Sequence, residues 1–270
     1  MLVTKFRDRI NRAIAEVAIS PVRKVVPWNW YYDVMDIYLR YRGFLFAGDK
    51  AMCPICGCRF REFISSPHDL CCPRCDSKDR FRLIYQYLKE ETSVFEGNLR
   101  IAHFAPELSL QRRIREIPNL EYFTVDLDST MVDYNMNIMD LDFEDDFFDG
   151  LICSHVLEHV ENDMKAMSEL HRVLRPGGWA IILVPLEHGR ATTLENPTIS
   201  TSRKRRELFG QSDHLRVYGR DFPDRLRASG FSVSAFDYCQ TSGEELCQRY
   251  GIINERTLWI CRKGDSVRSE

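Results

Sequence analysis

Four cysteines form two CPxC turns, Cys53-Pro-Ile-Cys56 and Cys72-Pro-Arg-Cys75, which are separated by fifteen residues. Each CxxC turn presents two thiolates to one ion, and four thiolates complete a closed tetrahedral shell around zinc. The spacing falls within the pattern of paired CxxC zinc sites. Because such a shell has no open position for water, we expect zinc to stabilise the fold and not to catalyse. Cys58 and Cys71 remain as spare thiols, since only Cys72 keeps the two-residue gap to Cys75.

The rest of the composition describes a globular chain. A length of 270 residues with 44% apolar residues suits one large core plus a small appendage, and a net charge of -3 does not suggest general affinity for nucleic acids. No segment approaches the roughly 18 apolar residues that span a bilayer, and the N-terminus lacks an apolar signal core. Six of the ten cysteines crowd into Cys53–Cys75. We expect the other four to be buried thiols in a reducing compartment, which favours a cytoplasmic location.

A second chemical centre lies within Asp149–Pro185, and its elements follow from periodicity. Gly150–Cys153 is a short apolar run that predicts a buried strand. From His155 to Leu174 apolar residues recur at helical spacing, and Arg175-Pro-Gly-Gly178 stops the predicted helix. Ala180–Val184 predicts a second strand. Together they indicate a βαβ unit of a parallel sheet.

Here the chain resembles a known family. A strand followed by His155-Val-Leu-Glu-His159-Val, an "EL-RVL-PGG" helix end and an apolar strand is similar to class I S-adenosylmethionine (SAM)-dependent methyltransferases. The resemblance covers roughly residues 98–262 and extends to a methyltransferase type 11-like subgroup with an N-terminal zinc ribbon and an "APE" turn. It implies an α/β, Rossmann-like seven-stranded sheet closed by a C-terminal antiparallel pair. The expected parts are a helical arm (1–50), the ribbon (51–80) and a methyltransferase domain (81–264).

The resemblance implies where the methionine end of SAM binds. Leu99–Phe104 predicts a buried strand that enters His103-Phe-Ala-Pro-Glu107, where most members have a GxGxG turn. This turn has no glycine, although Ala105 is small and Pro106 suits the first turn of a helix. The free amides of a helix over Leu108–Ile117 would face the SAM carboxylate. The candidate contacts are Phe104, Ala105, Pro106 and Glu107.

An acid is expected to bind the ribose. The predicted strand Tyr122–Val125 ends at Asp126, about twenty residues after the turn, where a carboxylate can accept bonds from both hydroxyls. Asp128 is the nearby alternative.

The adenine segment is also implied by the resemblance. Asn137 matches the position at which most members have an Asp, and its side-chain oxygen could accept a bond from the adenine amino group. Ile138 would flank the ring, and Ser154 at a strand end is a further candidate contact. Asp140 is explained as a solvated acid.

His155-Val-Leu-Glu158-His159 allows three interpretations. As HxxEH it is the inverted zinc-peptidase motif, which needs a second glutamate ligand in a helical fold; the flanking strands and the RPGG turn contradict this. In a second interpretation His155 is a general base without a metal. Since the strand delivers it toward the methyl group, His155 is a candidate catalytic residue in either methyltransferase interpretation.

The third interpretation is a metal site, and it comes from resemblance. The small-RNA 3'-end 2'-O-methyltransferases carry ExxEH after this strand plus a distant histidine. Glu158 and His159 match the second acid and the histidine, His155 stands in place of the first acid, and His214 matches the distant histidine. A divalent ion there could bind two adjacent hydroxyls and acidify one. Histidine in place of an acid shifts the preference from Mg or Mn toward Zn, Fe or Mn.

Residues 186–215 form a long polar insertion, which is typical of a lid or binding element. Arg203-Lys-Arg-Arg206 could bind an anionic substrate such as a phosphorylated or nucleotide-linked sugar, or could be a solvated helix start. His188 is another candidate for the rim of the pocket.

The N-terminal arm has two interpretations. Met1–Ser20 shows apolar residues at helical spacing, Pro21 and Pro27 break the chain, and Trp28–Phe46 is rich in aromatic residues. Residues 1–50 carry nine Lys/Arg against five Asp/Glu, a net charge of +4. This composition suits peripheral contact with a membrane surface, but it also suits an arm packed on the catalytic domain or on a second copy.

The expected function is therefore SAM-dependent methyl transfer. We expect O-methylation of a hydroxyl on a polar small-molecule or glycan-type substrate with a sugar or diol, and both a reaction assisted by a second divalent metal and a metal-free reaction stay open. The alternatives are an N- or S-methyltransferase, and a zinc-ribbon binding protein whose methyltransferase domain is degenerate.

Overall fold

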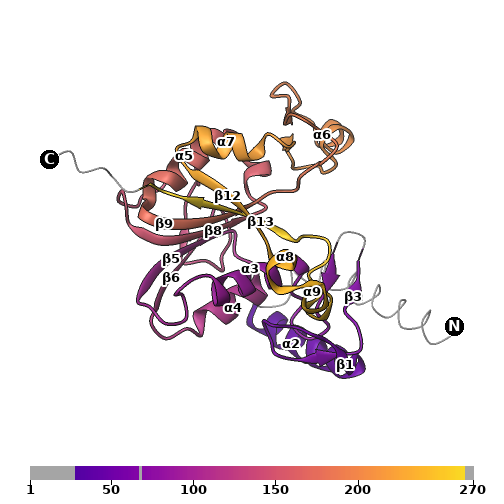
Figure 1. The fold of residues 1–270 in the computed structure, drawn as a ribbon. Helices are drawn as coiled ribbons and strands as arrows, with labels where there is room; N and C mark the ends of the chain where they lie inside the picture. The colour runs from indigo at the N-terminus through magenta and orange to yellow at the C-terminus, as the bar shows by residue number, and fades with distance from the viewer. Residues whose placement is uncertain (1–27, 67–68, 265–270) are drawn as a thin grey trace.

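A computed structural model describes residues 28–66 and 69–264 of the chain. Its centre is a seven-stranded sheet in the order β12-β13-β9-β8-β5-β6-β7, in which β13 alone runs antiparallel to its neighbours (Figure 1). The strands are β5 (Leu99–Phe104), β6 (Leu120–Asp126), β7 (Tyr134–Asn135), β8 (Phe148–Ser154), β9 (Leu174–Leu183), β12 (Ser232–Asp237) and β13 (Thr257–Arg262). The predicted α/β fold with a seven-stranded sheet is confirmed. The expected antiparallel pair is β12 and β13.

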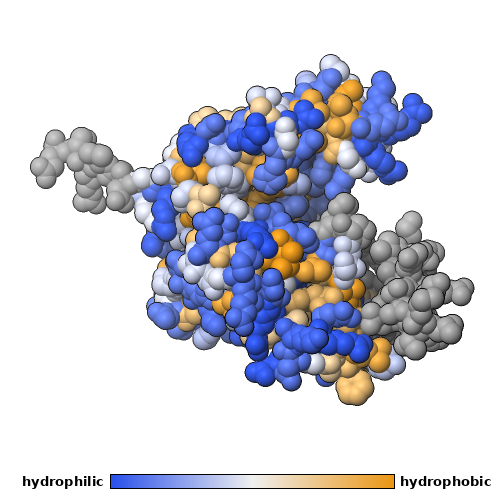
Figure 2. Space-filling view, turned by 45° about the vertical axis from the view of Figure 1, so that its right-hand side comes forward, coloured by the Kyte–Doolittle hydropathy of each residue, from blue (hydrophilic) through white to orange (hydrophobic). Residues whose placement is uncertain are grey.

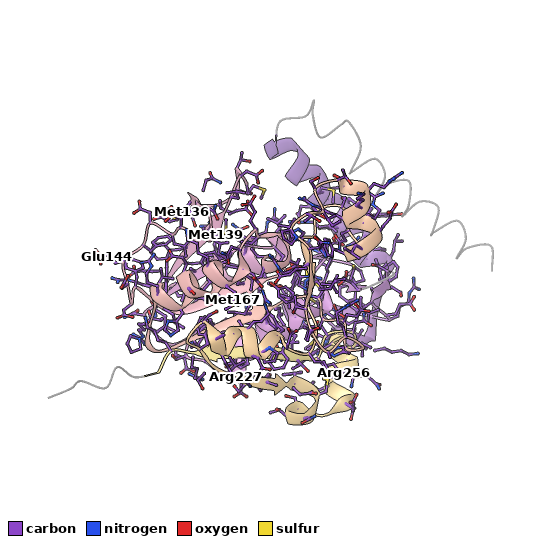
Figure 3. All side chains as sticks on the ribbon, turned by 90° about the horizontal axis from the view of Figure 1, so that it is seen from above. Met136, Met139, Glu144, Met167, Arg227 and Arg256 are labelled. Atoms are coloured by element: carbon purple, nitrogen blue, oxygen red, sulfur yellow. A yellow bond between two sulfur atoms is a disulfide. The ribbon has the colours of Figure 1, made fainter. Side chains whose placement is uncertain are left out.

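The side chains of the central strands alternate between two cores, as the two-residue period of a strand requires. Ile101, Ile152 and Ile181 face the first core, under α3 (Asp79–Glu90) and α4 (Leu108–Arg115). Ala102, Leu151, Cys153, Ala180 and Ile182 face the second core, under α5 (Asp163–Val173) and α7 (Phe222–Ala228). Figure 3 labels Met167 of α5 on this second face, and Met136 and Met139 pack against the same core.

The helix expected from His155 to Leu174 is wrong in its first turns. A short 3-10 helix, η2 (Leu157–His159), comes first, and α5 begins only at Asp163. His155 has φ 56°, outside the helical region, and Val160 is extended. Asn162 then starts α5 as its N-cap, because its side chain accepts a bond from Lys165 N. The apolar period is continuous across this break and therefore could not reveal it.

The ribbon contains two small hairpins, β1 (Ala47–Met52) with β2 (Arg59–Phe60) and β3 (Ile64–Ser65) with β4 (Leu70–Cys71). Helix α2 (Trp28–Leu45) packs against it (Figure 1). Arg42 of this helix donates to the carbonyls of Cys72 (2.9 Å) and Pro73 (2.8 Å). The predicted helix over Met1–Ser20 lies outside the described residues, and membrane contact through the arm stays a prediction. In the described ranges, no helix has the length and apolar character needed to cross a bilayer.

The connection between β12 and β13 contains two helices that the sequence did not predict, α8 (Tyr238–Ser242) and α9 (Glu244–Tyr250). A disulfide joins Cys239 of α8 to Cys247 of α9. The expectation that all cysteines outside the ribbon are buried thiols is therefore wrong for this pair. Linear spacing could not show that two short helices would fold back on each other. Cys153 and Cys261 are buried free thiols, as expected.

Candidate active site

The carboxyl ends of β5 and β8 carry two residues with positive φ, Ala105 (46°) and His155 (56°). Positive φ in non-glycine residues costs about 1–3 kcal/mol and is concentrated at functional sites. Backbone bonds hold both residues in place, from Ala105 N to Val125 O (2.8 Å) and from His155 N to Leu183 O (2.9 Å). Since β5 and β8 are paired neighbours, both turns lie at one edge of the sheet.

Asp126 is the last residue of β6 and is partly buried. Its Oδ1 accepts bonds from the amides of Asp128 (3.1 Å) and Ser129 (3.0 Å), which fix the carboxylate at the strand end. The alternative acid, Asp128, is exposed in the loop beyond. Asp126 is therefore the better fixed of the two acids, and its role as the ribose contact stays a prediction.

A buried histidine that sequence reasoning missed supports the turn after β5. His103 is fully buried in β5, with Nδ1 2.8 Å from the Tyr122 hydroxyl and Nε2 3.3 Å from Glu107 Oε2. Glu107 precedes α4 directly, so His103 lies against the residue before the helix, although these two atoms form no hydrogen bond within the described residues. A lone histidine inside an apolar strand gives no signal of such a role before the fold is known.

The other expected cofactor contacts occupy different environments. Asn137 is exposed, and its Oδ1 already accepts a bond from Met139 N at 2.9 Å. Ile138 is only 7% exposed and belongs to the second core. Ser154 is buried at the end of β8, and its Oγ has no hydrogen-bond partner within the described ranges. Phe104 is buried, whereas Pro106 is partly exposed.

Three residues of the predicted reaction centre lie close together in the structure. One donor atom from each of Glu158, His159 and His214 lies within 4.8 Å of the others, although His214 is far along the chain. Glu158 is 1% exposed, and neither of its oxygens has a hydrogen-bond partner in the part of the chain that the structure describes. His155 Nδ1 is 3.4 Å from Glu158 Oε1. A buried carboxylate without partners is costly unless a cation or a proton neutralises it.

The electrostatics of this cluster follow from burial. Burial raises the pKa of Glu158 to about 7. Burial also lowers the pKa of His155 to about 3, and the positive charges of Arg80 and Lys78 lower it further. The pKa of His214 is lowered by burial and by His159. His155 and His214 are therefore neutral at pH 7, the form in which imidazole binds metals.

A buried arginine holds the distant histidine in place. Arg216, in β11 (Arg216–Val217), donates to the carbonyls of Leu157 (2.7 Å), Val160 and Glu161 (2.9 Å). These carbonyls belong to η2 and the residues after it. One side chain therefore supplies hydrogen bonds to the carbonyl oxygens at the end of this 3-10 helix. Leu215 N adds a bond to Glu158 O (2.8 Å).

The insertion at 186–215 has structure of its own. It contains β10 (Leu194–Glu195), which pairs with β11, and α6 (Ser202–Phe209). Arg203, Lys204 and Arg206 of α6 are exposed, as is His188 near the start of the insertion. The surface is hollowed between the part that carries α6 and the part that carries the ribbon (Figure 2). A role of the insertion as a lid stays a prediction.

The four ribbon cysteines also converge, since the Sγ atoms of Cys53, Cys56, Cys72 and Cys75 all lie within 4.8 Å of one another. Both turns share one backbone pattern. The residue after the second cysteine has positive φ in each, 71° at Gly57 and 60° at Asp76, and donates to the first cysteine's carbonyl. The amides of Arg74 and Cys75 point at Cys72 Sγ (3.4 Å each). Such amide bonds favour a thiolate over a thiol.

Comparisons with known proteins agree with this fold. Residues 109–182 match the family described as "Methyltransferase domain". The uncharacterized protein MJ0638 of Methanocaldococcus jannaschii is 46% identical over 48 residues, which cover 18% of this chain and 21% of that protein. The match thus spans about a fifth of the relative's length.

Several solved structures are similar to this chain at low sequence identity. An S-adenosylmethionine-dependent methyltransferase from Mesorhizobium loti is 16% identical with a TM-score of 0.46 (67% of this chain, 98% of that one). The Burkholderia thailandensis 1,6-didemethyltoxoflavin-N1-methyltransferase is 17% identical with a TM-score of 0.43, and the match covers 62% of this chain and 72% of that one. The [4+2]-cyclase SpnF is 14% identical with a TM-score of 0.49, and the match covers 76% of this chain and 88% of that one. Because these scores are below 0.5, they assign no reaction to this chain.

The segment matched by the methyltransferase family extends from α4 to β9 and contains Asp126, η2 and the βαβ unit. It lies within a seven-stranded sheet of the expected type, and a four-cysteine ribbon precedes it. Residues 109–182 therefore match a methyltransferase-domain family, and a four-cysteine ribbon precedes them in the chain.

Proposed function

We propose that the protein methylates a hydroxyl of a polar substrate that carries a sugar or a diol, with help from a divalent metal. The observation that carries this proposal is the convergence of Glu158, His159 and His214, where both Glu158 oxygens are buried without hydrogen-bond partners in the described ranges.

The donor set fits a divalent metal. Two imidazoles and one carboxylate suit Zn, Fe or Mn better than Mg, which prefers oxygen ligands. A bound divalent ion supplies Lewis acidity, which lowers the pKa of a coordinated hydroxyl. Arg216 keeps His214 beside η2, and His155 contacts Glu158 from the end of β8. These residues would orient the acceptor hydroxyl next to the donor edge of the sheet.

The same edge of the sheet supports donor binding. SAM supplies the methyl group as an electrophilic sulfonium. We propose that Asp126 binds its ribose and that Asn137 and Ile138 bind its adenine. Phe104, Ala105, Pro106 and Glu107 would hold the methionine end, close to Ser154. The unpartnered Ser154 Oγ supports this, since a buried hydroxyl without a partner needs a ligand or a water.

In the ribbon we propose structural zinc, because four thiolates form a closed shell without a position for substrate. The ribbon would then fold only with its metal bound. Metal content of the wild type beside Cys56→Ala tests this, with zinc expected to be lost from the variant.

Two other functions compete with the proposed one. An N- or S-methyltransferase needs no acidified hydroxyl, and a degenerate domain would not bind SAM. Calorimetry with SAM separates the second alternative directly, because a degenerate domain releases no heat. The unpartnered oxygens of Glu158 favour a metal-assisted enzyme over both.

The decisive experiment measures metal content and methyl transfer together. Wild type and His214→Ala are compared, with His171→Ala as a matched control at a histidine of α5 that contacts Phe231. We expect the wild type and the control to bind one more equivalent of metal than His214→Ala. We also expect the wild type and the control to transfer label from SAM to an acceptor in cell extract at least tenfold faster than His214→Ala does. Equal metal content in all three proteins would exclude the metal-assisted mechanism.

A further inference from the structure

A cavity of about 900 Å³ lies where the ribbon meets the methyltransferase domain. Its walls come from α2, both cysteine turns, the start of α3 and the outer face of α4. Glu107, which follows the strained turn at Ala105, lines it as well. Cavities of this size hold small-molecule ligands. The cavity therefore adjoins the edge at which the proposed donor residues lie.

The charges on the cavity wall are unevenly paired. Three of the four acids that line it form ion pairs: Asp36 with Arg74 (3.1 Å), Asp76 with Arg42 (2.6 Å) and Glu116 with Arg113 (2.6 Å). The fourth, Glu107, has Oε2 3.3 Å from His103 Nε2 without a hydrogen bond among the described residues. Lys78 and Arg80, in contrast, share the single carboxylate of Asp69, at 3.2 Å and 3.1 Å. At this side of the cavity, two cations therefore share one paired carboxylate.

Burial and, after it, the positive charges of Arg80 and Lys78 lower the pKa of His155 at the end of β8. Arg80 Nε is buried without a hydrogen-bond partner among the described residues, and the guanidinium stacks over Phe81 at 4.6 Å. An unsatisfied charged donor is costly when no ligand or water completes it.

We infer that Lys78 and Arg80 bind an anionic group of the methyl acceptor, a phosphate or a carboxylate, in the cavity beside the ribbon. This inference rests on the proposed function, because it assumes that the acceptor hydroxyl reacts near His155 and Glu158. The acceptor would then be a hydroxylated small molecule with its anionic group toward the ribbon. The ribbon segment that follows Cys75 would take part in substrate binding as well as in folding.

Pyrophosphate and citrate serve as probes in calorimetric titrations of the metal-loaded protein saturated with S-adenosylhomocysteine. We expect the double variant Lys78→Gln/Arg80→Gln to bind the preferred anion at least tenfold more weakly than the wild type. Arg59→Gln, which removes an exposed ribbon cation paired with Asp49, should change the affinity less than twofold. Preference for pyrophosphate assigns phosphorylated acceptors, and preference for citrate assigns carboxylates.

Two results would overturn the inference. One is that neither anion binds the wild type. The other is that Lys204→Gln/Arg206→Gln on α6 abolishes binding whereas the Lys78/Arg80 variant retains it. Because Arg80 is mostly buried, the double variant could fold poorly. The single variant Lys78→Gln, at a 37% exposed side chain, is therefore measured alongside the double variant to exclude a folding defect. Failure of the metal experiment at His214 would leave this anion titration unaffected, so the two proposals fail separately.

Discussion

Glu255 precedes β13 and is partly buried, and Asp79 and Arg80 both act on its charge. Burial, followed by the negative charge of Asp79, raises its pKa from 4.5 to about 7. The folded protein thus holds this proton more tightly than the unfolded chain does. The contribution of Glu255 to stability is therefore full below pH 4.5 and is lost as the pH rises to 7. Glu255→Gln should stabilise the protein by roughly 1–3 kcal/mol at pH 8 and by about zero at pH 4.5.

Urea unfolding at the two pH values measures this difference. Glu207→Gln, at a glutamate with a 66% exposed side chain, is the matched control and should show no gain at either pH. An equal gain for Glu255→Gln at both pH values would contradict the burial argument, because a neutral glutamine replaces a neutral acid at low pH.

Asp126 and Asp128 form a second comparison at single residues. Asp126 is fixed by two amide bonds at the end of β6, whereas Asp128 is exposed. A hydrogen bond to a charged group contributes about 1.5–3 kcal/mol. Asp126→Ala should therefore weaken SAM binding by about 10–100-fold, and Asp128→Ala by less than about threefold, in calorimetric titrations. Unchanged affinity in Asp126→Ala would remove this acid from the cofactor site.

At the scale of elements, η2 and β11 depend on Arg216, which is 3% exposed. Arg216→Met would leave the carbonyls of Leu157, Val160 and Glu161 without their donor. We expect the variant to lose about 2–4 kcal/mol of stability and to bind the second metal at least tenfold more weakly. Its affinity for SAM should stay within twofold, because Asp126 lies on another element.

Arg227→Met is the control for this variant. Arg227 lies on α7, is labelled in Figure 3, has a 52% exposed side chain and pairs with Asp224. The Arg227→Met variant should retain the metal affinity and the stability of the wild type. If Arg216→Met kept full metal affinity, then His214 would not depend on this arginine for its position.

Elements whose pattern is local were predictable, and contacts between distant segments were not. The strand Leu99–Phe104 was predicted with its observed bounds, because Leu99, Ile101, Ala102 and Phe104 are apolar and Pro106 follows closely. The convergence of Glu158 with His214 was expected from family resemblance alone, since nothing in their spacing places them together. The conformations of Ala105 and His155, the bonds of Arg216 and the disulfide of α8 and α9 all depend on tertiary structure. Sequence periodicity carries no information about them.

At the scale of the whole molecule, Arg82 of α3 joins three parts that are far apart in the chain. It is fully buried and donates to Leu70 O (2.9 Å) and Ser77 O in the ribbon, and to Tyr250 O and Gly251 O (2.7 Å each) at the C-terminal end of α9. Its guanidinium lies 4.2 Å from the Phe63 ring. Gly251, with φ 65°, permits this packing because a Cβ there would lie 2.5 Å from Phe63.

Removal of this arginine should therefore uncouple the ribbon from the sheet. In the wild type, both parts should unfold together in urea, because one side chain satisfies carbonyls on each. In Arg82→Met, release of the ribbon metal, followed with a chromophoric chelator, should occur at a lower urea concentration than loss of the sheet's circular dichroism. Arg203→Met, at an 85% exposed side chain, is the control and should keep the transitions coincident. Coincident transitions in Arg82→Met would show that the apolar contacts of α3 alone hold the ribbon, since the hydrogen bonds would then contribute little to the coupling.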